Sequence, residues 1–487
     1  MKRRGFKHVK LHATSRTQKK RKGDILRKIK NLESLVENGE ASSRKILLQL
    51  MENVLAELDA SCRIRELMSL EGDKLVVGHM TIDLSRKRNV YLLGAGKACN
   101  AMASAVCSIL GNRIAKGIIS VKIAEPQDVY CNTNVFVGGH PIPNEDSFRA
   151  AKAMFALVDQ AQSDDLFISV ISGGSSALLS CPVAGVSPEE KKMTHDLMLR
   201  SGAKILEVNA VRRHLSQVNG GRLAERILKR GAQLINLIIS DGVGALPTVD
   251  RSLPKRVMGT PMAPDGTTVQ DARNAIVNYD LYEKLPKSVV GYLWDDARVT
   301  ETPKKLSGDV TNFLLDSVPD SCETARKAAD RMGIPSMILT TFLEGESKHV
   351  GMVFSSIARE IINNRRPIQR PCFVFASGET TTRVETKPDG TGGPSHELVL
   401  GFAQGIQGYD GVCMASIDTE GTDGTTLYAG GIADSKTCAR LSDKQINVFE
   451  ALRTHSSGDA LEAIGDTIFT GNTGTNLCDF NVLYISE

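Results

Sequence analysis

A lysine beside two glycines, directly after an apolar run, is the first group in this sequence that could do chemistry. In YLLGAGKACNAM the run ends in Gly94 and Gly96, and Lys97 follows at the expected start of a helix. Free backbone N–H groups at a helix N-terminus, together with an ammonium group, can bind a phosphate or a carboxylate. The stretch matches neither standard nucleotide motif, because Cys99 replaces the third glycine of GxGxxG and Ala98 the Ser or Thr of a Walker loop. It predicts either an unusual anion-binding loop or a tight turn that lets the helix pack on the strand.

A second turn of the same kind follows the apolar run in FISVISGGSSALL. Its small residues would let a ligand approach the backbone closely. They are Gly173, Gly174, Ser175 and Ser176. In the helix expected from EVNAVRRHLSQVNGG, Arg212 lies with Ser216 and Asn219 on a different face from the apolar stripe. A guanidinium there could bind a carboxylate or a phosphate, and a solvated face is the alternative.

Carboxylates at expected strand ends and in glycine-rich turns indicate a metal. The six acids of this kind are Asp241, Glu379, Asp418, Glu420, Asp423 and Asp434. Hard oxygen ligands near phosphates suit Mg²⁺, which usually binds one or two carboxylates and keeps several waters. We expect two or three of the six to face a site and the others to be turn or cap residues. Glycine loops, basic side chains and Mg²⁺-binding acids together form the set that phosphoryl transfer requires.

The elements that must position these groups are alternating strands and helices. Near-continuous apolar runs end in the turns just described, as in RNVYLLGAGK, DLFISVISGG, QLINLIISDG, PCFVFASGE and DGVCMASIDTE. Buried strands that alternate with helices predict an α/β fold with largely parallel sheets. In such sheets ligands bind beyond the carboxyl ends of the strands. All these turns leave such ends, so we expect them to converge on one site.

Length and composition set the wider frame. With 487 residues, of which 41% are apolar and 24% charged, the chain has room for two or three globular domains. It holds no apolar run of the length that a membrane helix needs, so we expect no membrane partner. Its ten cysteines include no CxxC pair, which favours a reducing compartment and a cytoplasmic location.

Residues 1–23 are rich in Lys and Arg and contain no acid, so we expect a disordered tail. A solubilising extension, an organelle transit peptide that would make the protein mitochondrial, and a nucleic-acid-binding arm are the alternatives for it. A nucleic-acid partner would depend on this tail alone, and we therefore do not expect one.

Nine short stretches, in a fixed order from about residue 45 to the end, resemble motifs of the class II glycerate kinase family. They are GAGKA, HPIPNEDS, ISGGSSALL, EVNAVRRHLS, IISDGVG, SGETT, GGPSHELVL, DTEGTDGTT and TGNTGTNLCDFNVL. The resemblance implies two α/β domains with the active site in the cleft between them. We expect a glycerate-kinase domain at 24–280 and a MOFRL-type domain at 281–487, with the boundary somewhere around 260–300.

The resemblance also implies ATP- and Mg²⁺-dependent phosphorylation of D-glycerate, at the 2-hydroxyl, to give 2-phosphoglycerate. Together with the analysis of the residues, it predicts catalytic roles for Lys97, Arg212 and Asp241. ATP is expected to contact the two glycine turns. The remaining predicted site residues are Glu379 and Asn476 as nucleotide contacts, and Asp241, Glu379 and Asp423 as ligands of Mg²⁺.

Several positions depart from the family pattern. Asn219 stands where the family has a lysine, Ala245 where it has an aspartate, and Gly259 begins a stretch that replaces SGPT. His396 and Glu420 replace a glutamine and an aspartate. The departures support one alternative, a noncatalytic relative that binds a nucleotide or hydroxy acid. The other alternative, an NAD(P)-dependent hydroxypyruvate reductase, is disfavoured because no strand is followed by GxGxxG.

Overall fold

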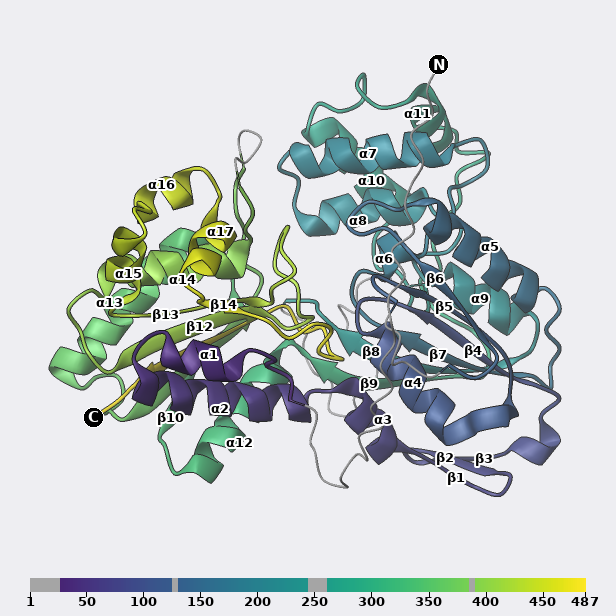
Figure 1. Ribbon diagram of the computed structural model, residues 1–487. Coiled ribbons are helices and arrows are strands. Elements are labelled where there is room, and N and C mark those ends of the chain that lie inside the picture. Colours follow the sequence, from purple (N-terminus) through teal and green to yellow (C-terminus); the bar gives the residue numbers. More distant parts are fainter. Residues whose placement is uncertain (1–26, 125–129, 244–260, 385–389) are drawn as a thin grey trace, which may run out of the picture.

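The computed structural model describes residues 27–124, 130–243, 261–384 and 390–487. Two lobes, each built on a six-stranded sheet, lie side by side (Figure 1). The tail expected at 1–23 and the departures at Ala245 and Gly259 lie outside the described residues.

The first lobe contains a fully parallel sheet with the strand order β6-β5-β4-β7-β8-β9. Its strands are β4 (Val90–Ala95), β5 (Ile114–Val121), β6 (Thr133–Val137), β7 (Leu166–Ile171), β8 (Gln233–Ser240) and β9 (Val310–Ser317). Helix α4 (Cys99–Leu110) covers one face, and α5 (Glu145–Val158) and α9 (Arg222–Lys229) cover the other. Because both faces are buried, the central strands are apolar along almost their whole length. The parallel α/β sheet predicted from the sequence is confirmed here.

A group of helices with its own apolar core extends this lobe at the top of Figure 1. It consists of α7 (Pro188–Arg200), α8 (Ile205–His214), α10 (Val269–Asn278) and α11 (Lys287–Leu293). The single-turn helix α6 (Ser175–Leu178) follows β7 directly and leads the chain towards this group. At the opposite end, α3 (Ala60–Leu67) and a small antiparallel sheet of β1 (Met68–Glu71), β2 (Lys74–Val77) and β3 (Met80–Asp83) complete the lobe.

The second lobe contains a mixed sheet with the order β10-β11-β15-β12-β13-β14. Its strands are β10 (Ser336–Leu343), β11 (Cys372–Gly378), β12 (Val412–Asp418), β13 (Gly430–Asp434), β14 (Thr467–Ile468) and β15 (Asp479–Ile485). Only β10 and β11 pair in parallel, whereas the other four pairings are antiparallel. The expectation of largely parallel strands is therefore wrong for this sheet. A strand buried on both faces reads as the same apolar run in either direction, and the last strand, β15, inserts between β11 and β12.

Helices cover both faces of this second sheet. They are α1 (Leu32–Glu37), α2 (Ala41–Glu57), α12 (Val318–Met332), α13 (Ser347–Asn364), α14 (Pro394–Gly405), α15 (Thr437–Asp443), α16 (Val448–Arg453) and α17 (Ser457–Ala463). The described N-terminal helices α1 and α2 thus pack on the C-terminal sheet (Figure 1). The chain passes from the first sheet to the second after β9. We therefore propose a domain division at 317/318, with α1 and α2 added to the second lobe.

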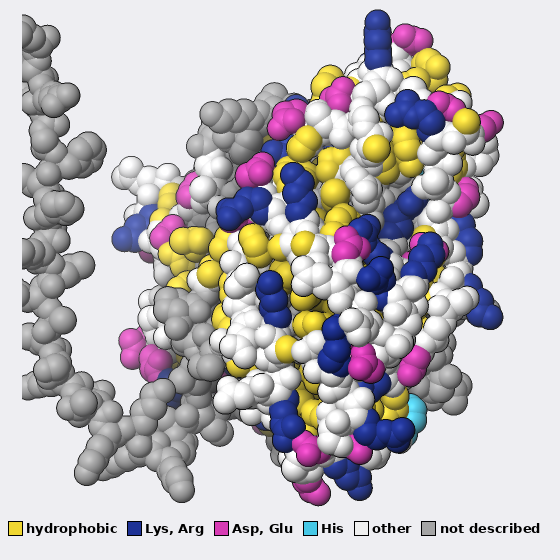
Figure 2. Space-filling model, turned by 90° about the vertical axis from the view of Figure 1, so that its right-hand side faces the viewer, with side chains coloured by type: hydrophobic (Ala, Val, Ile, Leu, Met, Phe, Trp, Pro, Cys, Tyr) yellow, Lys and Arg dark blue, Asp and Glu magenta, His cyan; other side chains and the backbone are white. Residues whose placement is uncertain are grey.

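Figure 2 shows a face of the first lobe on which Lys and Arg are interspersed with Asp and Glu, a distribution typical of a solvated surface. Within the described ranges, every helix is too short or too polar to cross a membrane.

A buried ion-pair network fastens α2 to the second lobe. The fully buried Arg44 donates from Nε to Asp434 at 2.5 Å and from Nη1 to Asp466 at 2.7 Å. It also donates to the backbone carbonyl of Leu35 at 3.0 Å. Among the described residues, Asp434 depends on this guanidinium for its neutralisation, while Asp466 pairs with both Arg44 and Arg440.

We expect Arg44→Met to lower the free energy of unfolding by about 3–5 kcal/mol, because it leaves Asp434 buried without its counter-charge and removes one of the two guanidinium partners of Asp466. Chemical denaturation followed by circular dichroism measures this change. Lys45→Met, at the exposed neighbouring position, is the matched control and should shift stability by no more than about 0.5 kcal/mol. Equal stability of the two variants would contradict the structural role of the network.

Candidate active site

The two glycine turns of the first lobe lie against each other. Lys97 N–H donates to the carbonyl of Gly173 at 2.9 Å, and Ala98 N–H donates to Ser172 Oγ at 2.9 Å. A Cβ at Gly94 would lie 2.6 Å from Cys99 Sγ, and a Cβ at Gly96 would lie 2.2 Å from Ser172 Oγ. Glycine is therefore needed at positions 94 and 96 because the neighbouring side chains pack too closely to leave room for a Cβ.

The turn after β7 is the meeting point of the predicted site residues. A Cβ at Gly173 would lie 1.6 Å from Asp241 Oδ2 and 2.3 Å from Asn476 Nδ2, so both side chains rest on its backbone. Gly174 has a left-handed backbone (φ +81°), and a Cβ there would approach Lys97 and His140 at 3.0 and 3.1 Å. Only glycine fits at either position without displacing these neighbours.

A lysine–glutamate–lysine bridge joins the two lobes at this point. Glu420, just after β12, pairs through Oε2 with Lys97 Nζ at 2.9 Å and through Oε1 with Lys122 Nζ at 2.6 Å. Burial alone would lower the pKa of Lys97, but Asp418 and Glu420 raise it above its usual value. Burial would raise the pKa of Glu420, yet Lys97 and Lys122 lower it to about 2. Lys97 and Glu420 are therefore charged at neutral pH.

Further carboxylates gather from the strand ends of both lobes. Asp241 follows β8 and accepts a hydrogen bond from Asn476 Nδ2 at 3.2 Å. Burial raises the pKa of Asp241, and burial together with Asp241 raises the pKa of Glu379, although the Glu379 side chain keeps contact with solvent. Burial and Glu420 raise the pKa of Asp418 to about 7. Burial and Asp418 raise the pKa of Asp479. The cluster holds more carboxylates than nearby cations neutralise.

Asp423 has a different surrounding. Its Oδ2 accepts hydrogen bonds from the backbone N–H of His396 at 2.9 Å and from the His396 ring Nδ1, and Gly393 packs against its carboxylate. Across the described part of the chain, no group of three or more His, Cys, Asp or Glu side chains is arranged to hold a metal ion. The three acids predicted as metal ligands therefore do not form a closed cage. Asp241 and Glu379 are near each other, and they fit the one or two carboxylates that Mg²⁺ takes beside a phosphate.

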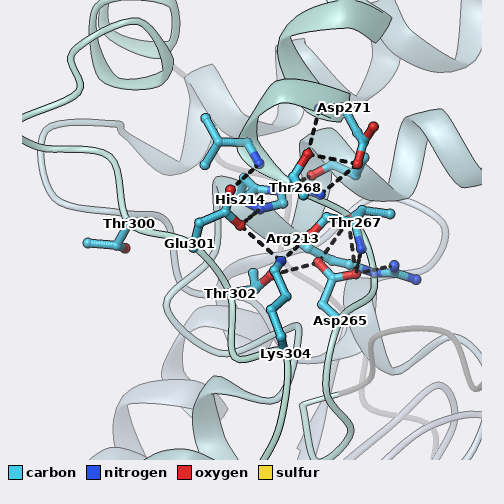
Figure 3. A network of polar contacts seen from close by, with 12 residues as sticks. Arg213, His214, Asp265, Thr267, Thr268, Asp271, Thr300, Glu301, Thr302 and Lys304 are labelled. Atoms are coloured by element: carbon cyan, nitrogen blue, oxygen red, sulfur yellow. Dashed lines mark hydrogen bonds and ion pairs between the residues drawn. The ribbon is translucent and has the colours of Figure 1, made fainter.

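Arg212 lines a separate pocket of the first lobe, with Ser176, Lys191 and His195. Burial and Arg213 lower the pKa of Arg212 to about 10. It donates to Asn209 Oδ1 at 3.3 Å and makes no ion pair within the described residues. Its neighbour Arg213 instead pairs with buried Asp265 at 2.8 Å (Figure 3).

The Arg213 pair belongs to a network that fixes the end of α8. His214 contacts Glu301 at 3.2 Å, and Thr267 and Thr302 donate to Asp265 (Figure 3). The two consecutive arginines therefore divide their roles, because Arg213 anchors the helix and Arg212 is presented to a pocket.

A cavity of about 240 Å³ opens beside the bridging glutamate, between the lobes. Lys97, Lys122 and Glu420 line one part of it, and apolar side chains line another. The apolar residues are Ile123, Leu427 and Phe469, which are 45%, 73% and 37% exposed. Sequence reasoning missed Lys122 and these three residues. Lys122 does follow the apolar strand β5 directly, which was an available signal for it.

Three departures from the family pattern, Asn219, His396 and Glu420, lie close to the site. Asn219 is buried, donates to Ser216 Oγ at 3.2 Å, and leaves its Oδ1 without a hydrogen-bond partner within the described residues. His396, by contrast, is fully buried and engages Asp423. The third departure, Glu420, is the carboxylate that pairs with Lys97 and Lys122, so one of the replaced residues lies in direct contact with the predicted catalytic lysine.

The fold and site define a two-lobed α/β protein with a lysine and carboxylates gathered at the strand ends between its lobes. Comparison with known proteins is consistent with this class. Residues 46–294 match the model of a domain of unknown function (DUF4147), and residues 372–479 match the MOFRL family. A glycerate 2-kinase from Pyrococcus horikoshii is 38% identical over 89% of this chain and 95% of its own length.

Two further relatives extend the comparison. A protein from Agrobacterium vitis named putative hydroxypyruvate reductase is 32% identical over 92% of this chain and 95% of its own length. The crystal structure of glycerate kinase from Thermotoga maritima covers 92% of this chain and 100% of its own, with 31% identity and a TM-score of 0.73. The chain belongs to the glycerate kinase family.

The raised pKa of Asp418 predicts a pH-dependent stability. An unfolded aspartate ionises near pH 4, while folded Asp418 keeps its proton up to about pH 7. Between these values the unfolded state binds fewer protons, so this group lowers stability as the pH rises. Asp418→Asn removes the effect. We expect its melting temperature, relative to the unmodified protein, to be about 2–4 °C higher at pH 8 than at pH 4.5.

The measurement is differential scanning fluorimetry in EDTA. Asp443→Asn, at an exposed position, is the control and should show the same difference from the unmodified protein at both pH values. A constant offset for Asp418→Asn would mean that Asp418 titrates normally.

Proposed function

We propose that this protein is a glycerate 2-kinase, which transfers the γ-phosphoryl group of ATP to the 2-hydroxyl of D-glycerate. Family membership and 38% identity to a glycerate 2-kinase support the reaction. The observation that carries the proposal is the position of Lys97, between the glycine turns of the first lobe and the carboxylates of the second. Phosphoryl transfer depends mainly on positioning and on neutralisation of charge, which such a group supplies.

We assign ATP to the cavity between the lobes. The apolar side chains of Ile123, Leu427 and Phe469 offer a surface for the adenine ring. The phosphates would then extend towards Lys122 and Lys97, the two ammonium groups of the same cavity. Glu420 holds both lysines, so it fixes their separation before the nucleotide binds.

Asp241 and Glu379 are the residues we assign to Mg²⁺. When bound with ATP, the ion neutralises phosphate charge and orients the γ-phosphoryl group. The raised pKa values of Asp241 and Glu379 fit carboxylates that await a cation. Asp423 is assigned instead to His396, which holds it by two hydrogen bonds.

The proton of the acceptor hydroxyl must leave as the new O–P bond forms. Asp418, whose pKa is about 7, is the carboxyl of the cluster best matched to accept a proton near neutral pH. Lys97 neutralises the charge of the transferring group, and Asn476 keeps Asp241 in place through its amide. We assign Arg212, which lines the smaller pocket of the first lobe, to binding of D-glycerate.

Reduction of hydroxypyruvate is the second candidate, favoured by the name of the relative from Agrobacterium vitis. The β4–α4 turn, with Cys99 in place of the third glycine, does not support a dinucleotide site. NADH and NADPH oxidation with hydroxypyruvate should therefore stay at background.

The test of the function is phosphorylation of D-glycerate by ATP, with the product isomer identified by NMR. We expect 2-phosphoglycerate. We expect Lys97→Met to lower kcat/KM about 100-fold or more, because it removes a charge that acts on the transferring group. Lys116→Met, at an exposed position of β5, is the control and should retain full activity. Turnover of Lys97→Met at the rate of the control would overturn the role of Lys97.

Mg²⁺ binding has a readout that does not depend on turnover. MgCl₂ should raise the melting temperature of the unmodified protein with ADP present, and Asp241→Asn should lose most of that increase, since ligand binding stabilises the folded state. Asp423→Asn should retain it. Loss of the increase in Asp423→Asn alone would instead make Asp423 the metal ligand.

A further inference from the structure

A second, smaller pocket lies inside the first lobe, between α7 and α8. Its polar lining consists of Ser176, Lys191, Thr194, His195 and Arg212, while Met198 and Leu215 contribute apolar walls. Lys191 and His195 lie one turn apart on α7 and face Arg212 on α8. Sequence reasoning identified only Arg212 and Ser176 of this set.

The pocket concentrates basic groups without a counter-charge. Lys191 is 7% exposed, and its Nζ donates to Ser180 Oγ at 3.0 Å. Neither Lys191 nor Arg212 forms an ion pair with a carboxylate in the described ranges, and His195 is only 5% exposed. Buried charges are normally paired. An anion seated between Lys191 and Arg212 would supply the missing charge.

The electrostatics of the empty pocket agree with this need. Burial and then Arg212 lower the pKa of Lys191 to about 7. Burial and Arg212 also lower the pKa of His195 to about 3, so its ring is neutral and can donate one N–H group. A bound anion would favour the charged form of Lys191 and accept hydrogen bonds from all three side chains.

The size of the pocket limits the kind of anion. Its volume is about 20 Å³, enough for a group little larger than a water molecule. A planar carboxylate fits this space better than a phosphoryl group with three terminal oxygens. Apolar walls at Met198 and Leu215 leave no room for a long substituent.

The pocket borders the glycine turn of the first lobe through Ser176. Ser176 follows the Gly173–Gly174 turn directly, and His140 lies against Gly174 beside the Lys97 side chain. Burial and Lys97 lower the pKa of His140 to about 3, so this ring is neutral, and Arg212 also acts on it. The turn from Gly173 to Ser176 is thus shared by the pocket and the Lys97 surroundings, and the hydroxyl groups of a short acid held by its carboxylate at Arg212 would have to reach this turn to be phosphorylated.

We infer that Lys191, His195 and Arg212 form the subsite for the carboxylate of the acceptor, and that this subsite makes the enzyme select short hydroxy acids over neutral polyols. The inference rests on the proposed function, because it takes D-glycerate as the acceptor. It adds Lys191 and His195 to the residues that bind the acceptor, and it assigns to them the selection of acids over neutral polyols.

The principal test is Lys191→Met, which keeps the length of the side chain and removes its charge. We expect KM for D-glycerate to rise at least about tenfold, because a charge-assisted hydrogen bond to the substrate is lost. KM for ATP should stay within about twofold. Lys191→Arg should restore part of the affinity for D-glycerate. An unchanged KM for D-glycerate in Lys191→Met would overturn the inference while leaving the kinase function intact.

Lys192→Met is the matched control, because the Lys192 ammonium lies over the Phe148 ring and does not line the pocket. It should leave both KM values unchanged. The unmodified protein provides a test that does not depend on a variant. D-glyceramide and glycerol, which lack the carboxylate, should be phosphorylated with kcat/KM at least about 100-fold below that of D-glycerate. A difference of less than threefold would overturn the inference.

Calorimetry without ATP separates failure of the subsite from failure of the function. If D-glycerate binds but is not phosphorylated, and Lys191→Met weakens binding at least about tenfold, the subsite stands and the kinase function fails. If D-glycerate neither binds nor reacts, both are overturned. Binding of D-glyceramide as tight as that of D-glycerate would overturn the subsite alone.

Discussion

The site depends on the two ion pairs that Glu420 forms, one with Lys97 and one with Lys122. One carboxylate from the second lobe holds Lys97 and Lys122, which follow neighbouring strands of the first lobe. Without it, two partly buried ammonium groups would repel each other at the junction of the lobes. With it, the strand ends of both sheets are brought to one place, and the Lys97 side chain is held beside the turn that carries Gly173 and Gly174.

Acidic and basic side chains around this bridge are concentrated in different places. Carboxylates gather at the junction of the lobes, where Asp241 of the first lobe and Glu379 and Asp418 of the second have raised pKa values. Basic side chains without acidic partners gather in the helical part of the first lobe, around Lys191 and Arg212. An unbalanced acid cluster fits a cation, and an unbalanced basic pocket fits an anion. The acid cluster therefore suits the metal ion of a metal-bound nucleotide, and the basic pocket suits the carboxylate of a small acid. These are the two proposed substrates.

Sequence reasoning predicted much of the fold and part of the site. The near-continuous apolar strands of the first lobe and the turns that end them followed from hydrophobic pattern and glycine position. The direction of β15 could not be predicted, because a buried strand carries no mark of its orientation. Lys191 and His195 were missed because residues four apart on a polar helix are usual on solvated surfaces, and only the packing of α7 on α8 turns them inward.

The sequence alone determined the α/β class, the glycine turns at the strand ends and the family resemblance, since these depend on residue type and local spacing. Tertiary structure decided which acids act together, because Asp241 and Glu379 are distant in sequence and meet only across the lobes. It also decided that Asp423 belongs to His396 and that Arg213 anchors the helix while Arg212 faces a pocket. Side-chain partnership depends on how elements pack, and a one-dimensional pattern does not contain that information.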